Sequence, residues 1–252
     1  MKSSNNAVLI TGGATGIGFA LAKVFIESGN QVLICGRRKE RLLEAQRKFP
    51  EIKILVCDVS KETDQENLFH YVKDKFPDIN ILINNAGIQR NISLLNGIED
   101  LQNGEDEIKI NLEAPIRLSM MFLPYLTQKK DSYLINVSSG LGFVPAVNMP
   151  IYSATKAGLH SFTKSLRQQL LNAKSDVKVI EIIPPAVESE LNLEERRKRG
   201  AKFNTSAEEF VEAVMKELLE DKLEIGYGFT EFVMNASKKE IDERFQTMNS
   251  RM

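Results

Sequence analysis

The sequence predicts an α/β fold in which a mostly parallel sheet is covered by helices on both faces. Short apolar runs of strand length alternate with longer helix-prone stretches, and a glycine-rich turn follows the first run directly. We find no internal repeat, low-complexity block or linker. Because regular alternation with right-handed crossovers builds a doubly wound parallel sheet, we expect a single domain spanning residues 1–252.

Each expected element is a stretch of suitable length and composition. Strands are expected at the apolar runs 7–10, 31–35, 52–57, 80–84, 132–138 and 177–183, with a weaker run near 224–229. Helices are expected at about 14–28, 38–48, 62–76, 106–127, 151–173 and 206–221. In such sheets ligands bind beyond the carboxyl ends of the strands, so motifs that follow the first, fourth and fifth strands should share one site.

Length, charge and cysteine content restrict the class of protein. A chain of 252 residues with a net charge of −1 can bury a sizeable core and has no basic surplus for nucleic acid or an anionic membrane. No apolar run approaches the roughly 18 residues that span a bilayer. Residues 1–6 lead directly into the first strand, so no signal peptide is expected. Cys35 and Cys57 lie in apolar runs and are expected to be buried, reduced thiols, which favours the cytoplasm. His70 and His160 have no partners at ligand spacing, so no metal site is expected.

A phosphate-binding turn is indicated at residues 11–18, Thr-Gly-Gly-Ala-Thr-Gly-Ile-Gly, between the first strand and a helix ended by Gly29. Glycines allow the backbone to turn tightly and approach a pyrophosphate, and the helix N-terminus presents unpaired N–H groups to its charge. A plain loop that needs positive φ is the alternative, but the strand–turn–helix context favours the phosphate site. The contacting residues are expected to be Gly12, Thr15, Gly16, Ile17 and Gly18.

Tyr152 and Lys156 are four residues apart, so on a helix they project from one face, one turn apart. A phenol has a pKa near 10, and lowering it to about 7 takes roughly 4 kcal/mol of phenolate stabilisation. An ammonium about 4 Å away supplies on the order of 4 kcal/mol at a semi-buried effective dielectric. The pair therefore fits a phenol that acts as acid and base near neutral pH. A plain amphipathic helix with a solvated lysine is the alternative, and this pattern alone does not exclude it.

Several motifs together resemble the short-chain dehydrogenase/reductase family. The resemblance runs from about Ala7 to Ser189 and implies a Rossmann fold with strand order 3-2-1-4-5-6-7 and an NAD(P)-dependent oxidoreductase. Its motifs are residues 11–18, Asn84-Asn85-Ala86-Gly87, Asn111, Ser139 and the Tyr152–Lys156 pair. Within the family, Gly36-Arg37, residues 84–89 and Pro184-Pro185 look most like one group of bacterial members.

The resemblance implies a role for each site residue. Tyr152 would be the acid/base, and Ser139 would hydrogen-bond the substrate carbonyl; Ser138 competes for this role, but the spacing of thirteen residues to the tyrosine selects Ser139. Lys156 would bond the nicotinamide ribose, and Asn111 would hold a relay water, with repair of a distorted helix as the alternative role. Further cofactor contacts are implied for Asp58, Val59, Asn85, Ala86, Gly87, Val187 and Ser189.

The end of the second strand favours NADP(H) over NAD(H). An acidic residue there would bind both ribose hydroxyls of NAD and repel the 2′-phosphate of NADP. Gly36 takes that place and leaves room, and Arg37 and Arg38 follow with charges suited to a phosphate. The alternative is that both arginines only begin a solvated helix, which would leave NAD(H) as the cofactor.

The expected substrate pocket is mostly apolar, which favours a ketone, aldehyde or alcohol with an apolar body. A charged segment at 190–204, within a helical region at about 188–222, is expected to be either a mobile lid or a plain surface helix. The pocket residues are expected to be Leu141, Phe143, Val144, Met149 and Pro150, with Gln89 and Arg90 at the rim.

Two functions of different classes follow from the motifs. The first is an NADP(H)-dependent oxidoreductase that acts on a small carbonyl or alcohol, and the second is a non-catalytic NADP(H)-binding sensor or scaffold. The full set of motif residues favours the enzyme. The resemblance also implies a homodimer or homotetramer built on helices at 108–127 and 152–172, although Leu159, Phe162, Leu166 and Leu170 could equally face the domain's own sheet.

Overall fold

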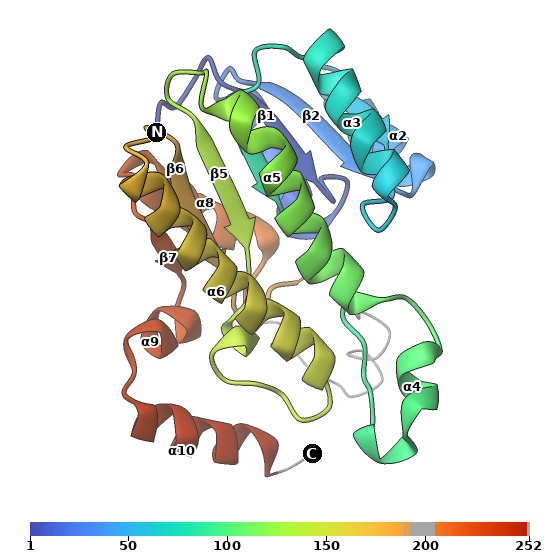
Figure 1. The fold of residues 1–252 in the computed structure, drawn as a ribbon, viewed down its shortest axis with the longest axis vertical. Helices are drawn as coiled ribbons and strands as arrows, with labels where there is room; N and C mark the ends of the chain where they lie inside the picture. Colours follow the sequence, from blue (N-terminus) through green and yellow to red (C-terminus); the bar gives the residue numbers. More distant parts are fainter. Residues whose placement is uncertain (189, 192–204, 251–252) are drawn as a thin grey trace.

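A seven-stranded parallel sheet in the order β3-β2-β1-β4-β5-β6-β7 forms the centre of the computed structural model, which describes residues 1–188, 190–191 and 205–250 (Figure 1). The predicted strand order is confirmed, and every strand pair in the described part is parallel. The strands are β1 (Ala7–Thr11), β2 (Gln31–Gly36), β3 (Lys53–Val56), β4 (Ile81–Asn84), β5 (Tyr133–Val137), β6 (Lys178–Ile183) and β7 (Glu224–Gly226).

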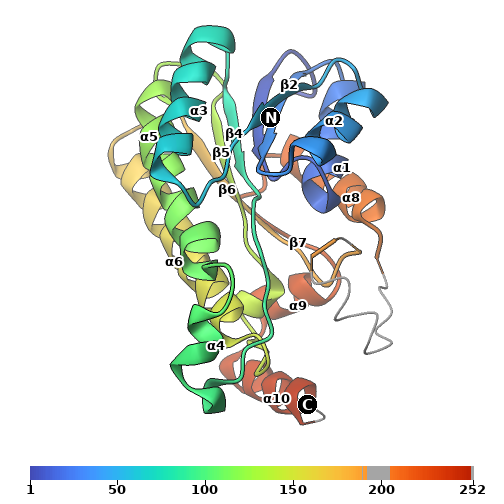
Figure 2. The ribbon, with the colours of Figure 1, turned by 90° about the vertical axis from the view of Figure 1, so that its right-hand side faces the viewer.

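Helices cover both faces of this sheet (Figure 2). One face carries α1 (Gly16–Glu27), α2 (Lys39–Lys48) and α8 (Ala207–Leu219), and the other carries α3 (Glu62–Lys75), α5 (Ala114–Leu126) and α6 (Pro150–Asn172). Each face has its own apolar core, because strands buried on both sides present alternate side chains to the two helix layers. Leu159, Leu166 and Leu170 of α6 are buried within this chain, so their spacing is explained by packing on the domain's own sheet.

The C-terminal part differs from the prediction. The strand expected near 224–229 ends at Gly226, and Gly228, at φ +56°, turns the chain into α9 (Phe229–Asn235). A further helix, α10 (Lys238–Asn249), begins with a capping box between Ser237 and Glu240. A short helix, α4 (Ile98–Gln102), was not expected either.

The helix predicted at 106–127 is regular only in its second part. Lys109–Glu113 form a π-helical turn before α5 begins, and Pro115 lies in the first turn of α5, where proline is tolerated. A π turn lengthens the hydrogen-bond spacing and redirects the side chains within it. This turn contains Asn111 and therefore affects the site described below.

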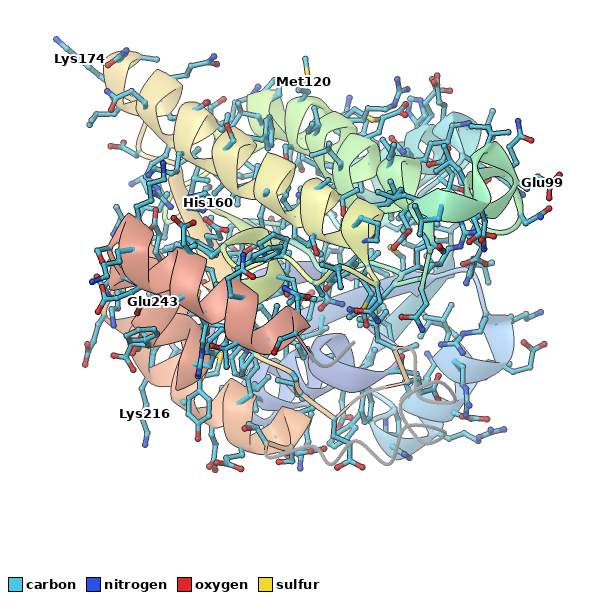
Figure 3. All side chains as sticks on the ribbon, turned by 90° about the horizontal axis from the view of Figure 1, so that it is seen from below. Glu99, Met120, His160, Lys174, Lys216 and Glu243 are labelled. Atoms are coloured by element: carbon cyan, nitrogen blue, oxygen red, sulfur yellow. The ribbon has the colours of Figure 1, made fainter. Side chains whose placement is uncertain are left out.

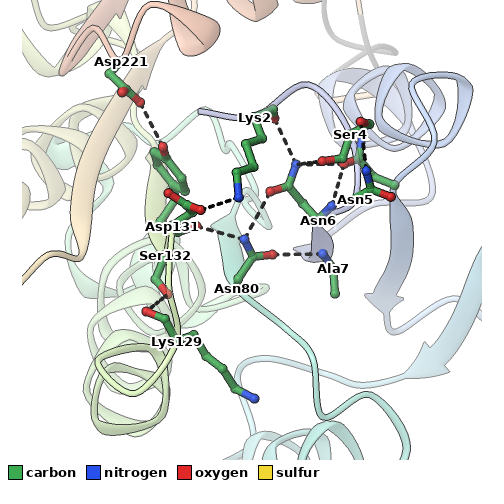
Figure 4. Close-up of polar contacts among 12 residues, drawn as sticks. Lys2, Ser4, Asn5, Asn6, Ala7, Asn80, Lys129, Asp131, Ser132 and Asp221 are labelled. Carbon is green, nitrogen blue, oxygen red and sulfur yellow. Dashed lines mark hydrogen bonds and ion pairs between the residues drawn. The ribbon is translucent and has the colours of Figure 1, made fainter.

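Polar side chains fasten the amino-end side of the sheet, opposite the carboxyl ends of the strands (Figure 4). Asn80 accepts a hydrogen bond from the Ala7 amide at 2.9 Å and donates to the Asp131 carbonyl at 2.8 Å. Lys2 pairs with the Asp131 carboxylate at 2.7 Å, and the Tyr133 hydroxyl donates to Asp221 at 3.0 Å. These contacts join the chain before β1 to the segments that precede β4 and β5.

A row of polar residues crosses four adjacent strands. Asn84, Asn136, Glu181 and Glu224 are register partners on β4, β5, β6 and β7. Asn84 donates to Asn136 at 2.9 Å, and Asn136 donates to Thr163 of α6 at 2.9 Å. We call these four residues the polar row; Asn84 contacts α5, and the other three contact α6. In the part of the chain that the structure describes, no helix has the length and apolarity to cross a bilayer.

Candidate active site

A cavity of about 650 Å³ opens at the carboxyl ends of the strands, where the predicted motifs meet. The loops after β1, β2, β4, β5 and β6 all contribute to its wall. The predicted cofactor residues that line it are Gly12, Thr15, Gly16, Ile17, Gly18, Arg37, Arg38, Asp58, Val59, Asn85, Ala86, Gly87, Tyr152, Lys156 and Val187. Ser189 and residues 192–204 of the expected lid lie outside the described residues.

The glycine turn is folded tightly against the loop after β4. Gly12 has φ +64°, and a Cβ there would lie 2.8 Å from the Ala86 Cα, so only glycine fits. The Thr11 hydroxyl accepts hydrogen bonds from the amides of Asn85 and Ala86 at 3.0 and 3.1 Å. At the start of α1, Thr15 makes no side-chain cap and the first turn holds no acid. The backbone N–H groups in the first turn of α1 therefore remain available to an anion.

Tyr152 and Lys156 face the cavity from the first turns of α6, which Pro150 begins. Both are almost fully buried, at 6% and 4% exposure. The Lys156 Nζ donates to the Val137 carbonyl at 2.9 Å and lies 5.7 Å from the centre of the Tyr152 ring. Burial lowers the pKa of Lys156 to about 8 while the Glu181 carboxylate raises it, so the side chain stays largely charged at neutral pH. The alternative of a solvated lysine is wrong.

Ser139 lies two residues after β5 and lines the same cavity as this pair. Its Oγ accepts a hydrogen bond from the Leu141 amide at 3.2 Å and retains its own proton for another acceptor. The following turn lies directly against α6, because a Cβ at Gly142 would come within 2.9 Å of the Lys156 carbonyl carbon. The neighbouring Ser138 also lines the cavity, and its buried Oγ has no hydrogen-bond partner among the described residues.

Asn111 is fully buried in the π turn and is absent from the cavity wall of the described residues. Its Oδ1 accepts from the Ile88 amide at 2.8 Å and its Nδ2 donates to the Ile88 carbonyl at 2.8 Å. The helix distortion considered in the sequence is present, but the carboxamide bonds the loop after β4 and not the helix backbone. A Cβ at Gly87 would lie 3.3 Å from Asn111 Oδ1 and 3.7 Å from Lys156 Nζ, so the three residues meet there.

Carboxylates hold the arginines that follow β2. Arg37 makes a two-pronged contact with Glu105, and Arg38 lies 2.9 Å from Glu190. Glu190 also binds Arg41 at 2.8 Å, and all five side chains line the cavity. Sequence reasoning missed Arg41, Glu105 and Glu190. Arg41 lies in the first turn of α2, three residues after its N-cap Arg38, a spacing that could have indicated it.

Asp58, after β3, lines the cavity. Its Oδ1 accepts from the amide and hydroxyl of Ser60 at 3.0 and 2.7 Å. Burial raises its pKa, but the bonds from Ser60 and the nearby cations outweigh this and leave the pKa below its ordinary value. The second carboxylate oxygen is free of any hydrogen bond that would compete with a ligand in the described part.

At the other end of the cavity the wall is mostly apolar. Leu141 and Met149 line it as predicted, together with Ala146, Phe229 and Met248, which sequence reasoning missed. The last two come from α9 and α10, whose contribution no motif indicated. Asn249 of α10 accepts from the Val147 amide at 2.9 Å and holds this helix against the loop before α6.

Three predicted pocket residues are corrected. The Phe143 ring packs on His160, with centroids 4.7 Å apart, and Val144 is fully buried behind the wall. Pro150 starts α6 and does not line the cavity of the described residues. The turn after Ser139 is a 3₁₀ helix (Gly140–Gly142), which rotates the next side chains away from the opening.

The two rim residues both line the cavity but differ in their bonding. The Gln89 Oε1 is buried without a partner in the described chain. Arg90 donates to the backbone carbonyls of Asp100 and Glu105 at 2.6 and 3.0 Å, so it fastens the loop after α4.

The fold and the site define a nucleotide-binding α/β enzyme with a buried tyrosine–lysine pair. A family model described as "short chain dehydrogenase" matches residues 6–200, and the chain belongs to this family of oxidoreductases. It is 42% identical over 251 residues to the uncharacterized oxidoreductase DltE of Bacillus subtilis (strain 168), covering 99% of both chains. This match confirms the prediction from Gly36-Arg37, residues 84–89 and Pro184-Pro185 that the chain resembles one group of bacterial members of the family.

Other relatives agree with this assignment. An uncharacterized oxidoreductase of Staphylococcus aureus (strain USA300) is 31% identical over 190 residues, covering 74% of this chain and 80% of the relative. Among solved structures, a short chain dehydrogenase from Burkholderia cenocepacia J2315 in complex with NADP has a TM-score of 0.82 at 24% identity, covering 97% of this chain and 99% of that one. A Burkholderia phymatum short chain dehydrogenase/reductase in complex with NAD has a TM-score of 0.82 at 19% identity, covering 90% of each chain. These structures establish the fold.

Proposed function

We propose that the protein is an NADP(H)-dependent oxidoreductase that moves a hydride between the nicotinamide and a carbonyl or alcohol, with Tyr152 as the acid/base. The observation that carries this proposal is that Lys156 is buried beside Tyr152 on one face of α6, with its Nζ 5.7 Å from the centre of the tyrosine ring. A buried ammonium is costly unless it stabilises a nearby charge, and a tyrosinate in the reaction would be such a charge.

The cavity residues fit a dinucleotide. Gly12 allows a close backbone approach, and the free N–H groups at the start of α1 suit a pyrophosphate. Asp58 and Val59 would contact the adenine, and Asn85, Ala86, Gly87 and Val187 would line its path to the nicotinamide. Solved structures of the same fold that contain NADP or NAD support a nicotinamide cofactor for this chain too. The bound nicotinamide would supply or accept the hydride.

Gly36, Arg37 and Arg38 support NADP(H) over NAD(H). Gly36 lines the cavity and carries no carboxylate that would repel a 2′-phosphate. The guanidinium groups of Arg37 and Arg38 would bind the 2′-phosphate by charge-assisted bonds. These bonds would replace their present ion pairs with Glu105 and Glu190. Arg41 would be the third cation of this subsite.

The remaining residues would orient the substrate and move its proton. In reduction, the Ser139 and Tyr152 hydroxyls would polarise the carbonyl oxygen, and Tyr152 would donate its proton to that oxygen. Lys156 would bind the nicotinamide ribose and stabilise the tyrosinate that remains. Asn111 would position Ile88 and its loop beneath the cofactor, and its π turn leaves backbone carbonyls without the usual helical partner, where a relay water would bind.

The apolar wall supports a substrate with an apolar body. Leu141, Met149, Phe229 and Met248 offer no charge to a phosphorylated or carboxylated group. We expect the enzyme to act in the cytoplasm as a homodimer or homotetramer. Two observations support a homo-oligomer. The chain belongs to this family, and two apolar side chains on α5 and just before it are exposed, Ile108 at 48% and Met120 at 67%.

A panel of ketones and aldehydes with apolar bodies, offered with NADPH, tests the proposal by loss of NADPH absorbance. Alcohols with NADP⁺ test the reverse reaction. Tyr152→Phe is the matched control, because it removes one oxygen and keeps the ring. Tight NADPH binding without turnover of any substrate in either direction would instead support the sensor or scaffold.

A further inference from the structure

Glu181 is a buried carboxylate that the proposed reaction does not use. It lies in the middle of β6 with no exposed surface. Its Oε2 accepts a hydrogen bond from His160 Nδ1 at 2.8 Å, and Oε1 has no partner among the described residues. A carboxylate in such a place is expensive unless a positive charge compensates it, so its surroundings should contain one.

Lys156 is the cation placed to compensate it, because its Nζ donates to the Val137 carbonyl at 2.9 Å and Val137 is the register partner of Ile182, the residue after Glu181. His160 follows Lys156 by one turn on α6, so both side chains project from the same side of the helix. His160 is also the residue that bonds Glu181. Burial lowers the pKa of Lys156 and Glu181 is the group that raises it. Phe143 packs on the imidazole from the turn after β5 and fixes its orientation. Figure 3 shows His160 on the side of α6 that faces the C-terminal helices.

The other members of the polar row offer no free charge to Lys156. On β7, Glu224 is the register partner of Glu181, but it is paired with Arg167 of α6 at 2.9 Å. On β5, the register partner is Asn136, which is neutral and bonded to Asn84 and Thr163. On α6 itself the titratable groups nearby are Tyr152, Lys156 and His160. Within the described chain, Glu181 is therefore the carboxylate of the polar row left to act on Lys156.

We propose that Glu181, oriented by His160, is a positioning residue that holds Lys156 charged and in place beside Tyr152. This role rests on the proposed function, since Lys156 matters through its action on Tyr152 and the cofactor. Glu181 acts through the lysine and touches neither substrate nor cofactor. Loss of its charge should leave a buried lysine that gives up its proton more readily.

The test measures the Lys156 ammonium directly, by NMR titration of the cofactor-free protein containing isotope-labelled lysine. Lys156→Arg identifies the resonance. In Glu181→Gln, which keeps an acceptor for His160, the pKa of Lys156 should fall by about one pH unit or more, the usual effect of an adjacent opposite charge. In the matched control Glu224→Gln, which removes the neighbouring carboxylate of the row, the shift should stay below about 0.3 units because Arg167 already neutralises that charge. Equal shifts in both variants, or none in Glu181→Gln, would overturn the proposal.

A second measurement covers the case in which Glu181→Gln does not fold, as judged by circular dichroism. In the unmodified protein with labelled glutamate, the chemical shift of the Glu181 carboxyl carbon should change in step with the titration of Lys156, because a nearby carboxyl senses the loss of the lysine charge. A Glu181 resonance that does not change over the Lys156 titration would contradict the proposal. Neither measurement needs cofactor or substrate, so failure here is distinct from failure of the proposed reaction.

Discussion

The guanidinium of Arg38 lies 2.9 Å from the carboxylate of Glu190. A carboxylate of this chain is therefore already paired with an arginine that is proposed to bind the cofactor phosphate. Glu190 binds Arg41 as well, and both arginines are partly exposed. A 2′-phosphate must displace this carboxylate before it gains its own bonds. Glu190 would thus compete with the proposed 2′-phosphate for these arginines.

Glu190→Gln should therefore tighten NADPH binding. Exposed ion pairs are worth about 0.2–1 kcal/mol, so the NADPH Kd should fall by up to about fivefold while that for NADH stays nearly constant. Calorimetry with both cofactors measures this difference. Glu188→Gln, at an exposed acid two residues earlier, is the control and should change neither Kd. A uniform gain for both cofactors would argue against competition at the phosphate.

Gly36→Asp should shift the preference towards NADH. The new carboxylate would accept bonds from the ribose hydroxyls and repel a 2′-phosphate, with each lost charge-assisted bond worth about 1.5–3 kcal/mol, less where solvent screens it. Gly36→Asn gives nearly the same shape without the charge and separates crowding from repulsion. The ratio of the two Kd values is the readout, and an unchanged ratio in both variants would refute the cofactor assignment.

Tyr152→Phe should bind NADPH normally and lose about 10²–10⁴ in turnover, the usual contribution of a positioned acid. Lys156→Ala should weaken NADPH binding and also lower turnover, because that side chain is proposed to contact the ribose as well as the tyrosine. Once a substrate is known, steady-state kinetics and calorimetry distinguish the two variants. Near-normal turnover by Tyr152→Phe would remove the tyrosine from the mechanism.

Stability should depend on Asp221 in a defined pH range. Burial raises its pKa, but hydrogen bonds from Lys178 and Tyr133 are among the contacts that outweigh this and lower it to about 2. A lowered carboxylate pKa stabilises the fold above the unfolded value, about 4, and this stability is lost as the pH falls towards 2. Asp221→Asn should cost about 1–2 kcal/mol at neutral pH, allowing for partial exposure, and little near pH 2. Urea unfolding across this range tests it, with exposed Asp242→Asn as control.

The parallel sheet and most of the cofactor wall could be predicted because each depends on local pattern. Apolar runs locate the strands, and the spacing from Gly12 to Gly18 locates the turn that ends β1. The contact between Tyr152 and Lys156 follows from one helical turn. Such features need no knowledge of what lies across the cavity.

Features that depend on distant contacts could not be predicted. The π turn around Asn111 occurs where its side chain bonds Ile88, more than twenty residues away, and no local residue preference indicates it. Phe229 and Met248 reach the cavity only because α9 and α10 turn back beneath it. Glu181 has the position of an ordinary strand residue, and its interest appears only when His160 and Lys156 are placed beside it.

Phe229 and Met248 also lie beyond residue 200, where the match to the family model ends. The glycine turn, Ser139 and Tyr152 all lie within the matched segment. The residues proposed for hydride chemistry therefore lie within the matched segment, whereas part of the apolar wall lies beyond it, so the last two helices can diverge while the proposed catalytic residues stay constant. Duplicated genes of this kind would acquire new substrates by exchanging their 3′ ends.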